Sequence, residues 1–180
     1  MILRRVVFAA VFAVACTPAA MSQQPLPQPV PWTRAVLGGG TVVFHQDAVQ
    51  ARVDDPVSGR LLSADELPTL IVACDAAQAA ATIEWPTDVA PAPSPGTRAF
   101  VLVDIGSSLQ TLSASTWVGE DRHTVLMTNG PAQVASWTRQ LSLVAKVTGT
   151  AGRLVVANFD TRGLGDALRS EGAACAHLLR

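Results

Sequence analysis

The apolar run at residues 67–74 constrains the fold more than any other part of the chain. It is built from β-branched and apolar residues, and its proline, Pro68, stands near the start, where a strand tolerates a missing N–H. Residues 82–85 alternate polar and apolar side chains, which is the period of a half-buried strand. Residues 75–78 separate the two runs by a length that suits a hairpin loop. The sequence therefore predicts a central antiparallel hairpin that ends its first strand at Cys74.

The composition fits one domain. A chain of 180 residues is long enough for one hydrophobic core and short for two. The formal net charge of −1 gives no electrostatic reason to expect a nucleic-acid partner. Alanine supplies much of the hydrophobic fraction, so we expect a core of mostly small side chains.

The N-terminus is typical of an export signal. A basic pair, Arg4 and Arg5, precedes an apolar stretch at residues 6–15 that is too short to span a bilayer. Ala13-Val14-Ala15 fits the small-residue rule of ordinary signal peptidase, but with Cys16 it also resembles a bacterial lipobox that has alanine in place of the usual leucine. We favour the lipoprotein interpretation because Cys16 directly follows the apolar stretch. Residues 1–15 are then a signal peptide and Cys16 carries the lipid.

The segment after Cys16 predicts a tether. Thr17 follows the cysteine instead of aspartate, which by resemblance to bacterial sorting rules favours the outer membrane. Residues 17–32 are rich in proline and glutamine, a composition that prefers extended polyproline II and packs no core. We therefore expect an anchor and tether at residues 16–34 and a single domain at residues 35–180. Cleavage by ordinary signal peptidase would instead give a soluble periplasmic protein.

The rest of the chain predicts a mostly β or α+β fold. Further strands are expected at residues 41–44, 50–54, 99–103, 109–118, 124–127, 141–147 and 153–159, with 50–54 at a sheet edge. The spacing of Val134, Trp137 and Leu141 predicts a short helix. A C-terminal helix, broken near Gly172, presents one face made of Leu164, Leu168, Cys175 and Leu178. The expected architecture is an antiparallel sheet or small sandwich, with the short helix and the C-terminal helix packed on it.

The cysteines indicate a disulfide. The chain has three, and setting Cys16 aside leaves Cys74 and Cys175, an even number in an exported protein. We expect these two to be bonded, which ties the central strand to the C-terminal helix; two buried free thiols are the alternative. Closing a loop of about 100 residues contributes about 4–5 kcal/mol in the chain-entropy treatment.

No motif in the sequence indicates catalysis. His45, His123 and His177 are far apart, and the chain has neither zinc-ligand spacing nor a P-loop nor a Gly-x-Ser-x-Gly elbow. Residues 38–40 are glycines that precede a strand, which favours a turn over a dinucleotide site. We therefore expect no enzyme activity and no catalytic, metal or cofactor residues. A triad assembled from distant residues, such as Ser113 or Ser115 with His123, is not visible from residue order.

Candidate interface residues are Trp85, Trp117 and Trp137, provided that they are exposed. Tryptophan is enriched in binding hot spots, and the competing interpretation is that these rings fill the core. An exposed edge strand, expected at residues 50–54, is a second candidate because it would accept a partner strand.

An ordered set of short motifs is similar to a known family. The motifs are Pro68-Thr69-Leu70-Ile71-Val72-x-Cys74, Ile83-x-Trp85, Val103-Asp104-x-Gly106, Trp137-x-x-x-Leu141, Ala157-x-Phe159-x-x-x-Gly163-Leu164-x-x-Ala167-Leu168 and Cys175. Over residues 67–175 this set resembles the VasI/TagO family of type VI secretion-associated periplasmic proteins. Leu102 departs from the pattern, since an arginine is expected there. The runner-up resemblance is to the invasion-associated locus B family, which typically carries more cysteines.

These observations predict a non-enzymatic binding or assembly module of the bacterial envelope. The resemblance implies a type VI secretion accessory role, with envelope or secretion-apparatus proteins as partners and the membrane reached through the lipid anchor. The alternatives are an invasion-associated locus B-like periplasmic protein and an unrecognised envelope hydrolase.

Overall fold

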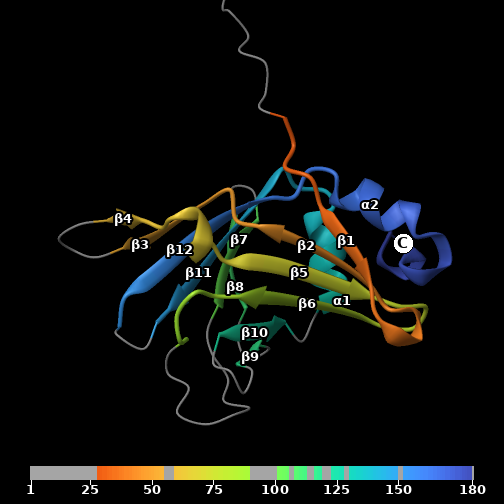
Figure 1. Ribbon diagram of the computed structural model, residues 1–180, viewed down its shortest axis with the longest axis horizontal. Coiled ribbons are helices and arrows are strands. Elements are labelled where there is room, and N and C mark those ends of the chain that lie inside the picture. The colour runs from red at the N-terminus through yellow and green to blue at the C-terminus, as the bar shows by residue number, and fades with distance from the viewer. Residues whose placement is uncertain are drawn as a thin grey trace, which may run out of the picture.

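Two antiparallel sheets of six strands each form the domain (Figure 1). The computed structural model describes residues 28–54, 59–89, 101–105, 108–112, 116–118, 123–127, 130–149 and 152–179, with the backbone alone over the three ranges between 101 and 118. The helices lie beside the sheets. The predicted β-rich fold with accessory helices is confirmed.

The first sheet contains the predicted central hairpin. Its strand order is β1-β2-β5-β6-β10-β9. The strands are β1 (Thr33–Val36), β2 (Val42–Asp47), β5 (Thr69–Cys74), β6 (Ala79–Glu84), β10 (Thr124–Met127) and β9 (Thr116–Val118). The N–H of Asp75 donates to the carbonyl of Gln78 at 3.0 Å and closes the β5–β6 loop. β1 begins inside the range expected for the tether.

The second sheet is built around the C-terminal hairpin, in the order β4-β3-β12-β11-β7-β8. The strands are β4 (Arg60–Leu61), β3 (Gln50–Asp54), β12 (Leu154–Asp160), β11 (Ser142–Thr148), β7 (Val101–Ile105) and β8 (Ser108–Leu112). The chain crosses from the first sheet to the second at Ala48 and Val49. There the Val49 N–H donates to the Asn158 carbonyl at 2.8 Å, which continues the β3–β12 pairing past the strand end.

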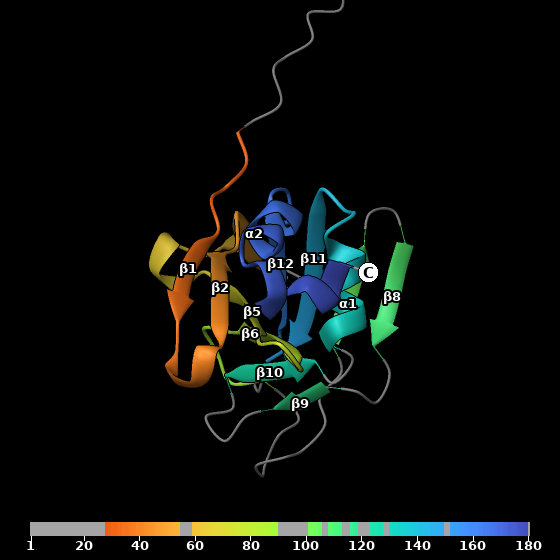
Figure 2. The ribbon, with the colours of Figure 1, turned by 90° about the vertical axis from the view of Figure 1, so that its right-hand side faces the viewer.

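The helices α1 (Gly130–Trp137) and α2 (Leu164–Ser170) and the 3-10 turns η3 (Gly172–Ala174) and η4 (Ala176–Leu179) pack together toward one end of the sandwich (Figures 1 and 2). Two more 3-10 turns lie elsewhere along the chain: η1 (Gly38–Gly40) follows β1, and η2 (Ala64–Glu66) precedes β5. α1 packs on β6 so tightly that a Cβ on Gly130 would lie 3.1 Å from the Cα of Ala80. Gly172 has a φ of +54° and stands where the break in the C-terminal helix was predicted.

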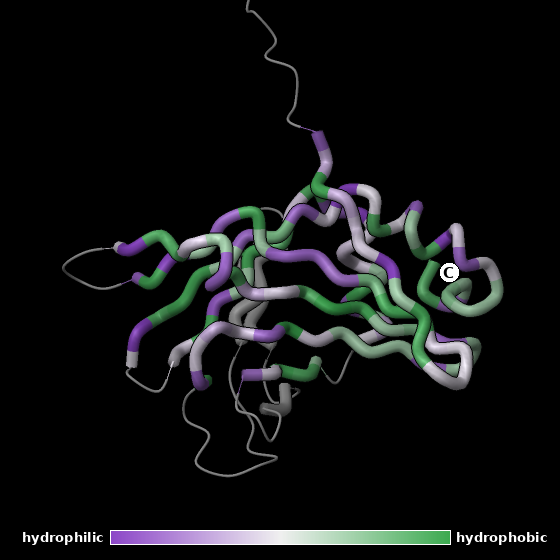
Figure 3. The backbone as a smooth tube through the Cα atoms, viewed as in Figure 1, coloured by the Kyte–Doolittle hydropathy of each residue, from purple (hydrophilic) through white to green (hydrophobic). Residues whose placement is uncertain are grey.

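The core lies between the sheets and under the helices. Figure 3 shows the long hydrophobic stretches of β5 and β12 that contribute to it. Its largest fully buried side chains include Trp137, Phe159, Leu70, Ile83 and Leu143. The four residues predicted to share a face of the C-terminal helix are all buried, namely Leu164, Leu168, Cys175 and Leu178. Cys74 and Cys175 form a disulfide with a Cα–Cα distance of 5.5 Å, as the cysteine count predicted.

Three sequence-based expectations about the fold are wrong. The strand expected at residues 109–118 is two strands, β8 in the second sheet and β9 in the first. β3 is not an edge strand, because it pairs with β12 on one side and with β4 on the other. β4 has 2 residues, too few to produce a periodic pattern that sequence reasoning can recognise. Leu141 does not continue the apolar face of α1, since the helix ends at Trp137 and the Leu141 side chain is 70% exposed.

Candidate functional site

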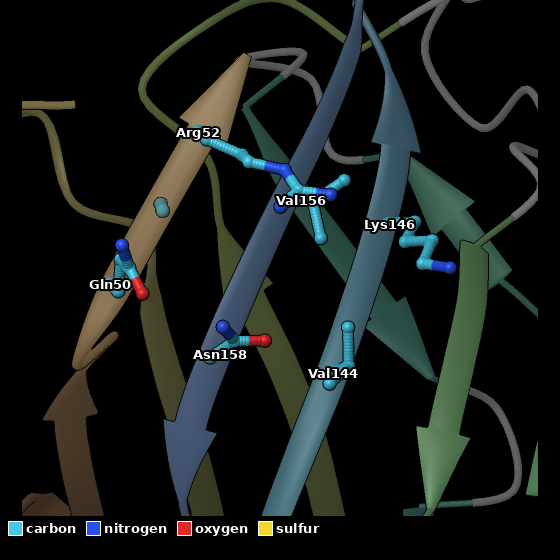
Figure 4. A pocket seen from close by; sticks show the side chains of 7 residues that line it. Gln50, Arg52, Val144, Lys146, Val156 and Asn158 are labelled. Carbon is cyan, nitrogen blue, oxygen red and sulfur yellow. The ribbon is translucent and has the colours of Figure 1, made fainter. Parts of the chain in front are cut away.

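The outer face of the second sheet carries a shallow hollow of about 190 Å³, which we call the central hollow (Figure 4). Because side chains alternate across a strand, burying Ala51, Ala145 and Ala157 turns their neighbours outward. The outward side chains come from three adjacent strands. They are Gln50 and Arg52 of β3, Val156 and Asn158 of β12, and Val144 and Lys146 of β11.

The central hollow combines an apolar floor with polar sides. Val144 and Val156 form the floor. Figure 4 shows Arg52 reaching from β3 over β12 toward Val156, and Lys146 on the far side of β11 with its ammonium directed away from β12. The Arg52 Nε donates to Asp54 Oδ1 at 2.6 Å, so this charge is already neutralised. Among the described residues, Lys146 has no ion-pair or hydrogen-bond partner for its ammonium.

A second, larger hollow adjoins the first at Asn158, which lines both. This strap hollow has a volume of about 520 Å³, and Val30, Leu141 and Arg162 are among its lining residues. Two of its apolar side chains are largely in solvent, since Val49 is 57% and Leu141 is 70% exposed. Together the two hollows follow β12 along the outer face of the second sheet.

One wall of the strap hollow is residues 28–32, which we call the N-terminal strap. Its Val30 N–H donates to Asp160 Oδ2 at 3.1 Å, and its Val30 carbonyl accepts from Gln46 Nε2 at 2.9 Å. Arg162 also donates to the Asp160 carboxylate, from Nε at 2.9 Å and from Nη2 at 2.6 Å. The strap is thereby fixed to β2 in one sheet and to the end of β12 in the other.

Asp160 is the charged centre of this attachment and is 5% exposed. Burial opposes ionisation of a carboxyl group. The hydrogen bonds from Arg162 and from the Val30 amide outweigh that effect, and they hold the pKa of the Asp160 carboxyl below its ordinary value. Asp160 is therefore an ionised, structural partner of Arg162 at neutral pH.

The tryptophans predicted as interface residues do not line either hollow. Trp85 is 3% and Trp137 is 0% exposed, so both rings fill the core and neither is available to a partner. The interface prediction required exposed rings, so it fails for these two residues, and the competing interpretation that they fill an alanine-rich core holds. Trp117 lies on β9, and its side chain falls outside the described residues. The lipidation site Cys16 and the signal peptide at residues 1–15 also fall outside them.

A histidine and a carboxylate meet near the end of β6. His123 Nε2 lies 3.2 Å from Asp88 Oδ1, and His123 Nδ1 lies 3.1 Å from the Trp85 carbonyl oxygen. Histidine and carboxylate are two of the three groups of a nucleophilic triad, in which the second ring nitrogen faces the nucleophile; in this structure that nitrogen of His123 faces the Trp85 carbonyl instead. The serines considered as the third member of the triad, Ser113 and Ser115, fall outside the described residues.

Within the part of the chain that the structure describes, no three His, Cys, Asp or Glu side chains are grouped so that they could hold a metal ion. No helix in the same ranges has both the length and the apolar character needed to cross a membrane.

Comparison with known proteins adds no relative. No protein-family model, curated protein or solved structure shows significant similarity to the chain. The resemblance to the VasI/TagO family over residues 67–175 therefore stays a prediction from short motifs.

Sequence reasoning missed the hollow-lining residues. Gln50, Arg52, Lys146 and Asn158 are ordinary polar residues of predicted strands, and each alternates with a buried alanine or valine. That alternation places them on an outward face, but only the pairing register brings them together. In the register Asn158 lies opposite both Gln50 and Val144.

Proposed function

We propose that this protein is an exported, non-enzymatic binding or assembly module of the bacterial envelope. It meets a partner protein through the outer face of its second sheet. The observation that carries the proposal is the continuity of the two hollows at Asn158, with exposed Val49 and Leu141 beside polar side chains. Contiguous exposed apolar side chains with a polar rim are typical of protein-docking surfaces.

The N-terminal strap supports a membrane-proximal role. The expected tether reaches the domain at residue 28, on the lining of the strap hollow. A lipid at Cys16 would therefore hold this face within reach of the membrane. Such tethering raises the effective concentration of the domain near membrane partners, so a weak interface suffices.

The specific form of the proposal is an accessory role in type VI secretion, and the motifs at residues 67–175 support it. Cross-linking in cells followed by mass spectrometry tests it. Recovery of secretion-apparatus proteins, together with a secretion defect on deleting the gene, is the expected result. Recovery of no envelope partner, with secretion unchanged, would reject both the accessory role and the binding module.

An envelope hydrolase is the second candidate: the His123–Asp88 contact at 3.2 Å supplies two of the three groups of a triad, and His123 Nδ1 would have to leave the Trp85 carbonyl to accept the proton of a nucleophile. Ester or amide hydrolysis by the purified protein, lost in His123→Ala and reduced in Asp88→Asn, would establish it. The hydrolase proposal is rejected if the protein hydrolyses no substrate in such a screen and neither substitution changes partner binding. The binding-module proposal then stands.

A further inference from the structure

We propose that the central hollow binds a carboxylate on an extended, acidic segment of the partner protein, and that Lys146 is the cation that receives it. This inference rests on the proposed function, because it assigns ligand chemistry to the same face. Beyond the proposed function, it assigns a role to Lys146 and a class of ligand, an acidic extended segment, to the central hollow.

Charge is the first argument. Lys146 is the only lysine of the chain, and its side chain is partly buried on the outer face of the second sheet. The nearby cation Arg52 is neutralised by Asp54, and Arg162 of the strap hollow is neutralised by Asp160. Among the described residues that line the hollows, Lys146 is therefore the cation without a counterion. An anionic group on the partner would supply one, and electrostatic complementarity of this kind fixes both partner choice and register.

The shape and hydrogen-bonding groups of the hollow supply the second argument. The side-chain amides of Gln50 and Asn158 each offer a donor and an acceptor, and neither has a hydrogen-bond partner among the described residues. An extended backbone presents N–H and C=O groups that suit such amides. The floor of Val144 and Val156 suits an apolar side chain of the same segment. Side chains two residues apart on an extended segment point the same way. The apolar and the acidic residue of the segment would therefore lie two positions apart and face the hollow, and the residue between them would face away from it.

Peptide selection tests the inference with a defined probe. Short random peptides displayed on phage are selected against the immobilised full-length mature protein, and the enriched sequences are synthesised for affinity measurements. The variants are Lys146→Met, which removes the charge, and Lys146→Arg, which keeps it. The matched control is Arg169→Met, since Arg169 lies on α2 and its side chain is 63% exposed. Circular dichroism confirms that each variant is folded.

We expect the enriched peptides to contain Asp or Glu. Lys146→Met should weaken their binding about fivefold, the range of a partly exposed ion pair. Lys146→Arg and Arg169→Met should leave it within about twofold of wild type. Replacing the acidic residue of the peptide by its amide should weaken wild-type binding by the same factor and add nothing to the Lys146→Met loss, as a double-mutant cycle requires.

Three outcomes would overturn the inference. They are enrichment of peptides without acidic residues, equal affinity for wild type and Lys146→Met, and no enrichment at all. Lysine-dependent binding to phosphatidylglycerol vesicles without peptide selection would assign Lys146 to lipid headgroups and would also overturn it. If cellular cross-linking recovers an envelope partner but the selected peptides bind wild type and Lys146→Met equally, the proposed function stands and this inference alone fails.

Discussion

The carboxylate of Asp160 accepts a hydrogen bond from the backbone N–H of Val30 at 3.1 Å, across a sequence separation of 130 residues. The same carboxylate binds the guanidinium of Arg162 through two oxygens. One buried side chain thus connects the N-terminal strap to the last strand of the second sheet.

Asp160→Asn should lower the free energy of unfolding by about 1–2 kcal/mol, because the amide replaces charge-assisted hydrogen bonds with neutral ones. Urea denaturation of the wild type and the variant measures the difference. Asp166→Asn is the matched control, since Asp166 also pairs with an arginine but its side chain is 80% exposed. Equal losses in the two variants would contradict the structural role given to Asp160.

The stability of the domain should fall in acid partly through Asp160. Its pKa is lowered in the folded state, so the folded protein binds fewer protons than the unfolded chain near the ordinary Asp pKa of about 3.9. The contribution is fully present above about pH 4 and is lost as the pH falls further toward the folded pKa. Between pH 5 and pH 2, the unfolding free energy of Asp160→Asn should therefore fall less steeply than that of the wild type. Parallel curves would show that Asp160 titrates alike in both states.

Reduction of the Cys74–Cys175 bond should destabilise the domain by up to about 4–5 kcal/mol, since the bond closes a loop with a sequence separation of 101 residues. Chemical denaturation with and without reductant measures this. The double variant Cys74→Ala/Cys175→Ala should unfold at the same denaturant concentration in both conditions. Two alkylatable thiols in freshly isolated, non-reduced protein would show that the bond does not form in the cell.

Gly130→Ala should destabilise the domain by about 1–3 kcal/mol, the cost of overpacking. Its Cβ would meet three backbone atoms of β6 at 3.1–3.2 Å, and backbone cannot move aside as a flexible side chain can. Gly38→Ala is the matched control, because a Cβ there has no atom within 4 Å. Thermal unfolding of both variants separates the packing effect from the general effect of replacing a glycine.

Cys16→Ser should move the protein from the membrane fraction to the soluble periplasmic fraction and alter its processing. The expected cause is loss of the acyl chains, which supply most of the membrane affinity of a tethered domain. Fractionation and N-terminal mass analysis provide the measurement. Unchanged partitioning and an unchanged N-terminus would instead favour ordinary secretion.

Short sequence patterns correctly predicted the features of the fold that depend only on residues close together in the chain. The β5–β6 and β11–β12 hairpins follow from alternation and turn residues, and the break at Gly172 follows from a conformation that glycine adopts readily. Features that depend on distant pairing were missed. The interior position of β3 requires β4, and the strap requires Asp160 to meet Val30. The central hollow belongs to this second kind, since Gln50 and Lys146 both line it only because their strands pair on either side of β12.

The strap also determines where a mechanical load on the N-terminus enters the domain. A pull on the residues before Gln28 reaches the Val30 bonds to Gln46 and Asp160 before it reaches β1, an edge strand whose four residues are all exposed. Asp160 ends β12, which has β3 on one side and β11 on the other. Through Asp160 the force is therefore shared by the β3–β12 and β12–β11 pairings. The edge strand β1 is loaded only after the Val30 hydrogen bonds have broken.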